Sequence, residues 1–201
     1  MTLTFTFKDG DHEFSCPVQC QRCEERNKNG RRCRNRVCIG VRYCWQLLQS
    51  VHHLRIKDSE IPGAGKGLFA SDPKKPEGVT IFKKGIVVTN YHGEPISLAE
   101  RQRRYRDKTA PYGIAYNKNS NEDGACRRGV GTIANHKRGS NVSLNKQNHV
   151  FKLIAKRPIK NHEEITAYYG SPDKKEGYRF DEPTTYSTKR IYTGRRQRRR
   201  R

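Results

Sequence analysis

The sequence has few hydrophobic residues, and this limits the size of its core. Only 32% of the 201 residues are hydrophobic, and methionine and tryptophan occur once each. We expect the core in 79–98 and 130–169, where the apolar residues gather. No apolar run is long enough to cross a bilayer, and the alternation of Thr and apolar residues in 1–7 is typical of a strand, not of a signal peptide. These features predict a soluble, intracellular protein with no membrane partner.

Acidic residues are scarce relative to basic ones. The chain has 20 Asp and Glu against 42 Lys and Arg, which gives a formal net charge of +22. Such an imbalance favours polyanions as partners. The stretch from Lys189 to Arg201 carries eight Lys or Arg and no acid. We predict a tail, disordered when free, that serves nuclear import or binds nucleic acid, and a solvated end without a partner is the alternative.

Cysteine is absent after Cys126, and six of the seven cysteines lie between Cys16 and Cys44. Because no signal peptide is evident, we expect a reducing compartment, in which these residues bind metal instead of forming disulfides. Free thiols are the alternative. Cys16 and Cys20 could form a second metal site with Cys23 only by sharing ligands.

The later cysteines resemble a small zinc motif that often ends in Cys-Trp-x-His. Its counterpart here is Cys23-x9-Cys33, followed by Cys38 and by Cys44-Trp45. Leu47 occupies the position of the motif's histidine. The resemblance is therefore incomplete, and the fourth ligand must come from elsewhere.

Structural zinc needs four ligands, and the resemblance implies that they are Cys23, Cys33, Cys38 and Cys44. His52 or His53 could take the place of Cys38. Residues 16–57 carry ten Lys or Arg against two acids. We therefore expect this module to dock non-specifically on nucleic acid, through phosphate contacts with little reading of sequence.

The chain divides into four parts. Residues 1–15 form an N-terminal strand segment that ends in a turn, and 16–53 form the Cys-rich zinc module. Residues 54–170 form the main domain, and 171–201 form a polar and basic tail that we expect to be partly disordered. The sequence contains no internal repeat.

Local patterns in the main domain predict a mainly β protein with few short helices. Residues 86–89 are a β-branched run, and Phe151, Leu153 and Ala155 alternate with their neighbours as on a half-buried strand. Residues 97–100 read as a capping box, in which a Ser side chain accepts from the first turn and a Glu reaches back. This box predicts a helix that ends before position 111, where a proline follows.

Three motifs and one strand end stand in a characteristic order. The motifs are Ile61-Pro62-Gly63-Ala64-Gly65-Lys66-Gly67-Leu68-Phe69, then Ile133-Ala134-Asn135-His136 followed by Asn141, and then Glu163-Glu164-Ile165-Thr166-Ala167-Tyr168-Tyr169-Gly170. Tyr91-His92-Gly93-Glu94 stands between the first two. Over 54–170 this pattern resembles the SET-domain protein lysine methyltransferases. The resemblance implies a SET-domain fold, with several small sheets around a pseudoknot-like threading.

The resemblance also implies the roles of individual residues. The methyl donor, S-adenosylmethionine, would contact the backbone of a glycine loop and an Asn-His pair: Gly63, Gly65, Lys66, Gly67, Asn135 and His136. Tyr169 matches the catalytic tyrosine, and Tyr91 matches the tyrosine of the lysine channel, to which Tyr112 and Tyr116 are further candidates. Oxygen atoms around the transferring methyl stabilise its partial positive charge, and a narrow apolar channel lowers the pKa of the attacking lysine.

The second motif departs from the family pattern Asn-His-Ser-Cys-x-Pro-Asn. Residues 135–141 keep both asparagines and the histidine but lose Ser, Cys and Pro. Thr132 stands where arginine is frequent, which implies an altered cofactor contact. Because no cysteine follows Cys126, the C-terminal zinc cluster of part of the family is absent from this sequence.

Two further departures concern the lysine channel. With no C-terminal zinc cluster, the channel must be closed in another way, and Tyr178, Phe180 and Tyr186 are candidates for an aromatic lid. Ala167 stands where Phe or Tyr is frequent, and its small side chain would leave room for di- or trimethylation.

Together these features predict an S-adenosylmethionine-dependent protein lysine N-methyltransferase whose target is a histone. Histone tails and this chain are both basic and repel each other, so we expect the DNA of a nucleosome to attract the protein to its substrate. This substrate predicts a location in the nucleus. The alternative is a zinc-dependent nucleic-acid or chromatin-binding protein whose SET-like domain is catalytically inactive.

Overall fold

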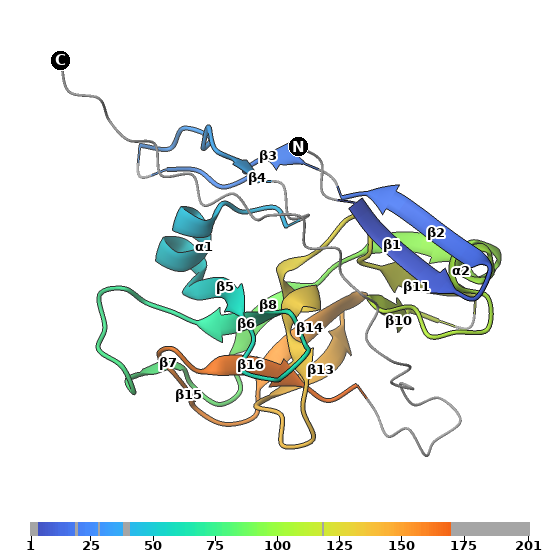
Figure 1. Ribbon diagram of the computed structural model, residues 1–201. Coiled ribbons are helices and arrows are strands. Elements are labelled where there is room, and N and C mark those ends of the chain that lie inside the picture. The colour runs from blue at the N-terminus through green and yellow to red at the C-terminus, as the bar shows by residue number, and fades with distance from the viewer. Residues whose placement is uncertain (1–3, 19, 28, 38–40, 118, 170–201) are drawn as a thin grey trace.

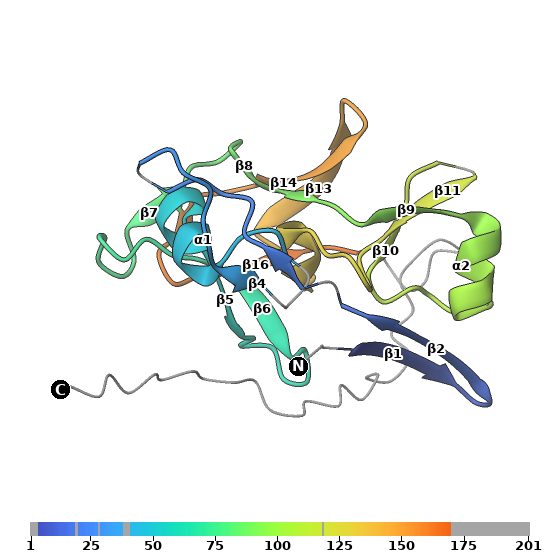
Figure 2. The ribbon, with the colours of Figure 1, turned by 90° about the horizontal axis from the view of Figure 1, so that it is seen from above.

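The computed structural model describes residues 4–18, 20–27, 29–37, 41–117 and 119–169. Within these ranges the chain forms mostly short strands in small sheets, with two α-helices and one 3-10 helix. The two α-helices lie at opposite ends of the molecule, α1 close to the Cys-rich segment and α2 beside the first hairpin (Figures 1 and 2). The predicted class, mainly β with few short helices, is confirmed.

The bounds of the described elements are as follows. The strands are β1 (Thr4–Asp9), β2 (His12–Pro17), β3 (Gln21–Arg22), β4 (Arg36–Val37), β5 (Leu54–Asp58), β6 (Lys66–Ala70), β7 (Thr80–Phe82), β8 (Val87–Tyr91), β9 (Glu94–Ser97), β10 (Gly113–Ala115), β11 (Ser120–Asp123), β12 (Asn135–His136), β13 (Val142–Gln147), β14 (Val150–Ala155), β15 (Ile159–Lys160) and β16 (Glu164–Ala167). The helices are α1 (Trp45–His52), α2 (Leu98–Tyr105) and the 3-10 helix η1 (Val130–Ile133).

Both strands that the sequence predicted in the main domain are present. β8 covers most of the β-branched run, and β14 buries Phe151, Leu153 and Ala155 while the residues between them are only half-buried. These two strands pair antiparallel, and β13 lies on the other side of β14. A second three-stranded sheet has the order β10-β11-β9.

A four-stranded sheet, in the order β12-β16-β6-β5, connects segments that lie far apart in the sequence. β16 runs parallel to β12, with Asn135 opposite Thr166, and antiparallel to β6, with Ile165 opposite Leu68. β6 begins inside the glycine motif, and β12 consists of the Asn-His pair. The sheet therefore brings all three sequence motifs to one place.

Helix α2 begins where the capping box predicted, but only half of the box forms. The Ser97 side chain accepts a hydrogen bond from the backbone N–H of Glu100 at 3.1 Å. The Glu100 carboxylate does not reach back to Ser97, because it accepts hydrogen bonds from Arg103 at 2.7 Å and Arg104 at 2.6 Å. Charge-assisted hydrogen bonds to two guanidinium groups are stronger than one neutral bond to a backbone amide, so the carboxylate turns along the helix.

The main hydrophobic cluster is shared between the Cys-rich segment and the strands of the main domain. It contains the buried Cys23, Cys33 and Leu48 together with Leu54, Leu68 and other strand residues. Residues from both segments thus leave water together, which favours their folding as one unit. Among the described residues, no helix is long and apolar enough to span a membrane.

A second cluster attaches the β1–β2 hairpin to the rest of the molecule. Phe5, Phe7 and Phe14 pack with Tyr105 of α2 and with Ala125. A disulfide between Cys16 and Cys126, which are 110 positions apart in sequence, closes the same contact covalently. Cys20 is disulfide-bonded as well.

The prediction that the cysteines of the N-terminal module bind metal instead of forming disulfides is therefore wrong for Cys16 and Cys20. A second metal site on Cys16, Cys20 and Cys23 is excluded for the same reason. Cys126 comes within bonding reach of Cys16 only because the hairpin packs on Tyr105, a contact that local sequence patterns do not reveal.

The ion pairs on α2 lead to a pH-dependent stability. Hydrogen bonds from Arg103 and Arg104 lower the pKa of Glu100 from 4.5 to about 2. Because the folded pKa is the lower one, the pairs stabilise the fold fully above about pH 4.5, and this contribution is lost as the pH falls toward 2. We expect Glu100→Gln to lower the free energy of unfolding at pH 7 by up to about 1 kcal/mol.

Thermal unfolding of both proteins at several pH values checks this expectation. The difference in melting temperature should shrink as the pH falls below 4.5 and vanish only below pH 2. Glu13→Gln is the control, because the Glu13 side chain is 51% exposed and pairs with only one lysine, Lys8. A difference for Glu100→Gln that stays constant down to pH 2 would contradict the assignment.

Candidate active site

The carboxylate of Glu164 joins two of the sequence motifs. This residue on β16 is 7% exposed. Its carboxylate accepts hydrogen bonds from the Ser59 hydroxyl at 2.7 Å, the Glu60 backbone N–H at 2.8 Å and the Asn135 side-chain amide at 3.1 Å. A buried carboxylate is stable only when such donors surround it. It therefore fixes the start of the glycine loop relative to β12.

The glycine motif is shaped by its residue types. Gly63 and Gly65 have φ angles of 76° and 69°, a region that costs other residues energy. Gly67 is needed for a different reason, since a Cβ atom there would lie 2.4 Å from Oε1 of Glu164. The motif thus combines a left-handed loop with a close approach to the buried carboxylate.

Asn135 binds the glycine motif directly. Its side-chain amide donates to the backbone carbonyl of Lys66 at 3.0 Å as well as to Glu164. The Lys66 ammonium group turns away and pairs with Asp58. Lys66 therefore contributes its backbone to this site, whereas its charge lies outside.

Asn141 connects the start of β13 to β16. Its amide donates to the Glu163 carboxylate at 2.9 Å and to the Glu164 carbonyl at 2.8 Å, and its carbonyl oxygen accepts from the Thr166 N–H at 2.9 Å. Asn141 is 2% exposed, so all these bonds are shielded from water. Its position explains why the second asparagine of the motif is kept: it holds β16 in place.

His136 and Tyr169 are in contact. The Nδ1 atom of His136 accepts a hydrogen bond from the Tyr169 backbone N–H at 3.0 Å, and the two rings lie 5.3 Å apart. Burial, and then the charge of Arg138, lowers the pKa of His136, so the ring is neutral near pH 7. In a neutral ring whose Nδ1 accepts, Nε2 carries the proton and is a donor.

The hydroxyl groups of two tyrosines donate hydrogen bonds to backbone carbonyls. The Tyr169 hydroxyl donates to the Ala134 carbonyl and the Tyr91 hydroxyl donates to the Tyr112 carbonyl, each at 2.5 Å. Burial raises the pKa of Tyr91 well above its ordinary value, and the nearby Tyr169 and Asp123 act in the same direction. Both oxygens therefore have lone pairs to offer, and the Tyr91 phenol stays protonated.

The remaining tyrosine and threonine candidates have other contacts. The Tyr116 hydroxyl donates to the His149 carbonyl at 3.0 Å, at the β13–β14 hairpin. The Thr132 hydroxyl donates to the Gly129 carbonyl at 2.8 Å, inside the turn of η1. Tyr112 therefore contacts Tyr91 through its backbone carbonyl, whereas the Tyr116 hydroxyl binds the β13–β14 hairpin.

An ion cluster that the sequence analysis missed stands behind Tyr91. Arg104 of α2 pairs with Glu94 and Glu100 and with Asp123, whose side chain is fully buried. The Tyr105 hydroxyl also donates to Asp123, at 2.7 Å. The cluster joins α2, β9 and β11. Its one signal in the sequence was Glu94, which follows Tyr91-His92-Gly93.

Three cysteine sulfurs come together beside α1. The Sγ atoms of Cys23, Cys33 and Cys44 lie within 4.8 Å of one another, and all three residues are buried. Burial raises the pKa of the Cys23 thiol. Burial acts the same way on Cys44, but hydrogen bonds, first among them that from the Asn35 amide, outweigh it and lower its pKa. Such a set of thiols is suited to a soft metal ion.

The two histidines that are alternatives for the fourth ligand both lie near carboxylates. The Nε2 atom of His52 lies 2.8 Å from Glu25, and its ring stacks on Tyr43. His53 lies near Asp72, with Nδ1 3.5 Å from its carboxylate. Cys38, the remaining candidate, lies outside the described residues, as do the lid candidates Tyr178, Phe180 and Tyr186 and the tail 171–201.

A small cavity borders the site. Its volume is about 130 Å³, and Glu60, Ile61, Lys137 and Glu164 are among the residues that line it. It opens beside the Glu164 carboxylate, next to the glycine loop. Both acidic and basic groups line it, among them Arg157 and Glu163, which form an ion pair.

Comparisons with known proteins agree on the family. A family model described as the SET domain matches residues 65–170. Among solved structures, a chain of an active polycomb repressive complex 2 in the stimulated state is similar, with a TM-score of 0.51 and 27% identity over 60% of this chain. A chain of the Chaetomium thermophilum polycomb repressive complex 2 has a TM-score of 0.50 and 26% identity over 59%.

The similarity is limited to one part of those larger chains. The present chain covers 16% of the first and 15% of the second. No curated protein matches the sequence.

The buried carboxylate of Glu164 gives a testable expectation. Glu164→Gln replaces one of the two carboxylate oxygens with an NH₂ group, which cannot accept a hydrogen bond. At least one of the donors Ser59, Glu60 and Asn135 would then lose its buried acceptor. We expect the free energy of unfolding to fall by about 1–3 kcal/mol, measured by urea denaturation.

The control is Glu60→Gln in the same loop. The Glu60 side chain is 66% exposed, so this change should stay within about 0.5 kcal/mol of the unsubstituted protein. Equal stability of both variants would show that the Glu164 carboxylate does not hold the loop.

Proposed function

The chain belongs to the SET-domain family, and from this premise we propose that it is an S-adenosylmethionine-dependent protein lysine N-methyltransferase. One observation carries the proposal. The hydrogen bonds Asn135–Lys66, Asn135–Glu164 and Tyr169–His136 bring the three motifs together within one region of the fold.

The residues present fit the methyl donor. A glycine loop with two positive φ angles exposes backbone groups that a ligand can approach, and a neutral His136 offers a donor at Nε2. When bound, S-adenosylmethionine supplies a methyl group on a positively charged sulfur. We assign its binding to the loop and to the pair beside it: Gly63, Gly65, Lys66, Gly67, Asn135 and His136.

Tyr169 and Tyr91 supply oxygen lone pairs to the reacting groups. Because each hydroxyl already donates its proton to a backbone carbonyl, its oxygen is oriented as an acceptor. An acceptor can bind the ammonium or amine of a lysine and can stabilise partial positive charge on a transferring methyl. The raised pKa of Tyr91 argues against a role for it as a base at pH 7.

Ala167 bears on the number of methyl groups added. It lies two residues before Tyr169 and is 2% exposed, so no large side chain from this position narrows the site. We propose that the product is di- or trimethylated lysine.

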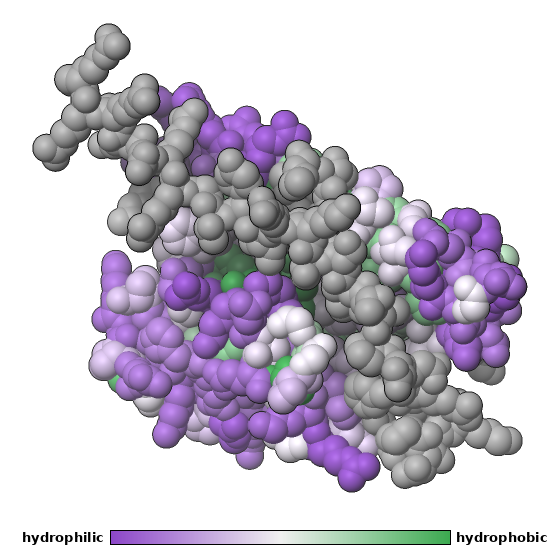
Figure 3. All heavy atoms as spheres, in the orientation of Figure 1, coloured by the Kyte–Doolittle hydropathy of each residue, from purple (hydrophilic) through white to green (hydrophobic). Residues whose placement is uncertain are grey.

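We propose a histone in a nucleosome as the substrate and the nucleus as the location. The charge of +22 opposes binding of an isolated basic tail and favours DNA. On the face shown in Figure 3, hydrophilic residues cover both the end with α2 and the end with β3 and β4. The exposed arginines of the Cys-rich segment include Arg31, Arg34 and Arg36.

Methyl transfer to nucleosomes tests this function. Purified protein with labelled S-adenosylmethionine should methylate nucleosomes faster than a free histone peptide. Tyr169→Phe should lower kcat by about a hundredfold, because one oxygen that stabilises the transition state is lost. Asn135→Ala should weaken cofactor binding measured by calorimetry, because the loop loses its tie to β12.

Tyr168→Phe is the matched control, since this neighbouring side chain is 44% exposed. Equal turnover on nucleosome and peptide at low salt would count against the nucleosome as the preferred substrate. Mass spectrometry that finds only monomethyl lysine at saturation would refute the inference from Ala167. Absence of both methyl transfer and cofactor binding would leave the alternative, a chromatin-binding protein with an inactive SET domain.

We also propose that Cys23, Cys33 and Cys44 hold a structural zinc ion. Two sulfurs that are each about 2.3 Å from a tetrahedral zinc lie roughly 3.8 Å apart. The Cys33 and Cys44 sulfurs are 3.9 Å apart, and the backbone N–H of Cys44 donates to the Cys23 sulfur at 3.2 Å. The fourth position goes to a ligand outside these three thiols.

Metal analysis and thermal unfolding test the zinc site. The isolated protein should contain about one zinc, and a strong chelator should remove it and lower the melting temperature. Cys33→Ser should lose the metal, whereas Ser50→Ala on the exposed side of α1 should keep it. Metal-free protein whose melting temperature does not respond to added zinc would exclude the site.

A further inference from the structure

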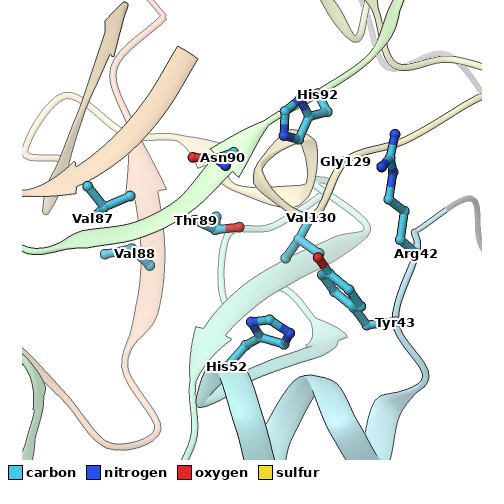
Figure 4. A pocket seen from close by; sticks show the side chains of 10 residues that line it. All are labelled: Arg42, Tyr43, His52, Val87, Val88, Thr89, Asn90, His92, Gly129 and Val130. Carbon is cyan, nitrogen blue, oxygen red and sulfur yellow. The ribbon is translucent and has the colours of Figure 1, made fainter. Parts of the chain in front are cut away.

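A cavity away from the candidate active site lies between the Cys-rich segment and the main domain. Its volume is about 200 Å³. Residues from four parts of the chain line it (Figure 4): the 42–43 segment, the end of α1, β8 with the residue after it, and the start of η1. None of the residues assigned above to the cofactor or to the lysine is among them.

The polar groups in this cavity can act as hydrogen-bond donors. They are Arg42, Tyr43, His52, Thr89, Asn90 and His92. The described residues offer no hydrogen-bond partner to the side chains of Thr89, Asn90 and His92. In Figure 4, Arg42 and His92 lie on either side of Gly129. Burial, and then the charge of Arg42, lowers the pKa of His92, so its ring is neutral and donates one N–H.

No carboxylate lines the cavity. Two acids instead approach its basic groups from outside: Glu24 lies 3.4 Å from the Arg42 guanidinium and Glu25 lies 2.8 Å from His52. They orient these side chains, and after burial their charge also raises the pKa of the Tyr43 hydroxyl. An anion in the cavity would meet the donors and the Arg42 cation, and it would compete with Glu24 for that cation.

The remaining walls are apolar. Val87, Val88 and Val130 are among the lining residues, and the Tyr43 ring stacks on His52, with ring centroids 4.3 Å apart. The space is larger than a phosphate group alone requires, so a carbon-containing neighbour of the anion also fits. A sugar–phosphate unit has this combination of a charged group and a less polar body.

We propose that this cavity receives a backbone phosphate of a bound nucleic acid, with the adjoining sugar against the valines. The Cys-rich segment that contributes Arg42 and Tyr43 also carries exposed arginines, and the segment and the whole chain are strongly basic. The inference rests on the proposed function in one respect, the docking of this module on DNA.

The position of the cavity links docking to catalysis. β8 forms one wall and ends in Tyr91, and the Gly129 N–H donates to the His92 carbonyl at 2.6 Å just before η1. η1 leads directly to Ala134 and Asn135. A nucleic acid held here therefore contacts the two segments that lead into the candidate active site.

Binding of a short fluorescein-labelled DNA duplex, measured by polarisation over a series of salt concentrations, tests the proposal. Arg42→Gln should weaken binding about tenfold and reduce the slope of log affinity against log salt by about one. Thr89→Val removes only a hydroxyl and should weaken binding about threefold. Lys74→Gln, the control, removes one positive charge from an exposed loop outside the cavity and outside the Cys-rich segment, and should change affinity less than about twofold.

NMR of the histidine rings supplies a second measurement. Added duplex, and inorganic phosphate at higher concentration, should shift the His92 signals more than those of the exposed His162. Equal effects of Arg42→Gln and Lys74→Gln, together with unmoved His92 signals, would overturn the proposal. Displacement of the duplex by poly-glutamate at equal charge concentration would also overturn it, in favour of an acidic protein partner.

Failure of this inference is distinguishable from failure of the proposed function. Methyl transfer to a free lysine peptide does not require DNA, so Arg42→Gln should leave it unchanged while slowing transfer to nucleosomes. If the unsubstituted protein methylates neither the peptide nor nucleosomes, the proposed enzyme activity is refuted. The DNA-binding measurements would still test the cavity.

Discussion

The fold depends on one buried carboxylate. Glu164 lies in the central strand of the four-stranded sheet and accepts hydrogen bonds from the loop before β6 and from β12 on the other side of β16. A charge this deep is tolerated because three donors bind the carboxylate. The same requirement dictates the glycine at 67, where any side chain would collide with the carboxylate. The geometry of the candidate active site thus follows from the need to satisfy a single ion.

A second buried polar network lies near Tyr91. The Arg104 cluster behind it brings three carboxylates to one guanidinium, and Asp123 also accepts from Tyr105 and from the backbone of Ala125. These bonds fix β9, β11 and α2 relative to one another. The two polar networks therefore hold the two halves of the candidate site separately, one beside the glycine loop and one beside Tyr91.

Local sequence patterns predicted the features that depend on residues close together in the sequence. The strands at Val88 and Leu153 and the cap at Ser97 follow from periodicity and from the chemistry of one side chain, and the three motifs identified the family. Contacts between distant residues were beyond such patterns. The Cys16–Cys126 disulfide needs the hairpin to pack on Tyr105, and the role of Glu164 needs β16 to lie between β12 and β6. Helix α1 was missed because its cap, Cys44, makes no side-chain hydrogen bond that a pattern could reveal.

The order of strands in the four-stranded sheet has a consequence for biosynthesis. β16 occupies an interior position, yet it is the last described strand to leave the ribosome. Until then the nascent chain carries β6 with an open edge and the Asn135 segment without its parallel neighbour, and exposed edges of this kind invite pairing with other chains. Formation of the four-stranded sheet therefore waits until β16 has emerged, and a chaperone that shields β6 until then would raise the yield of native protein.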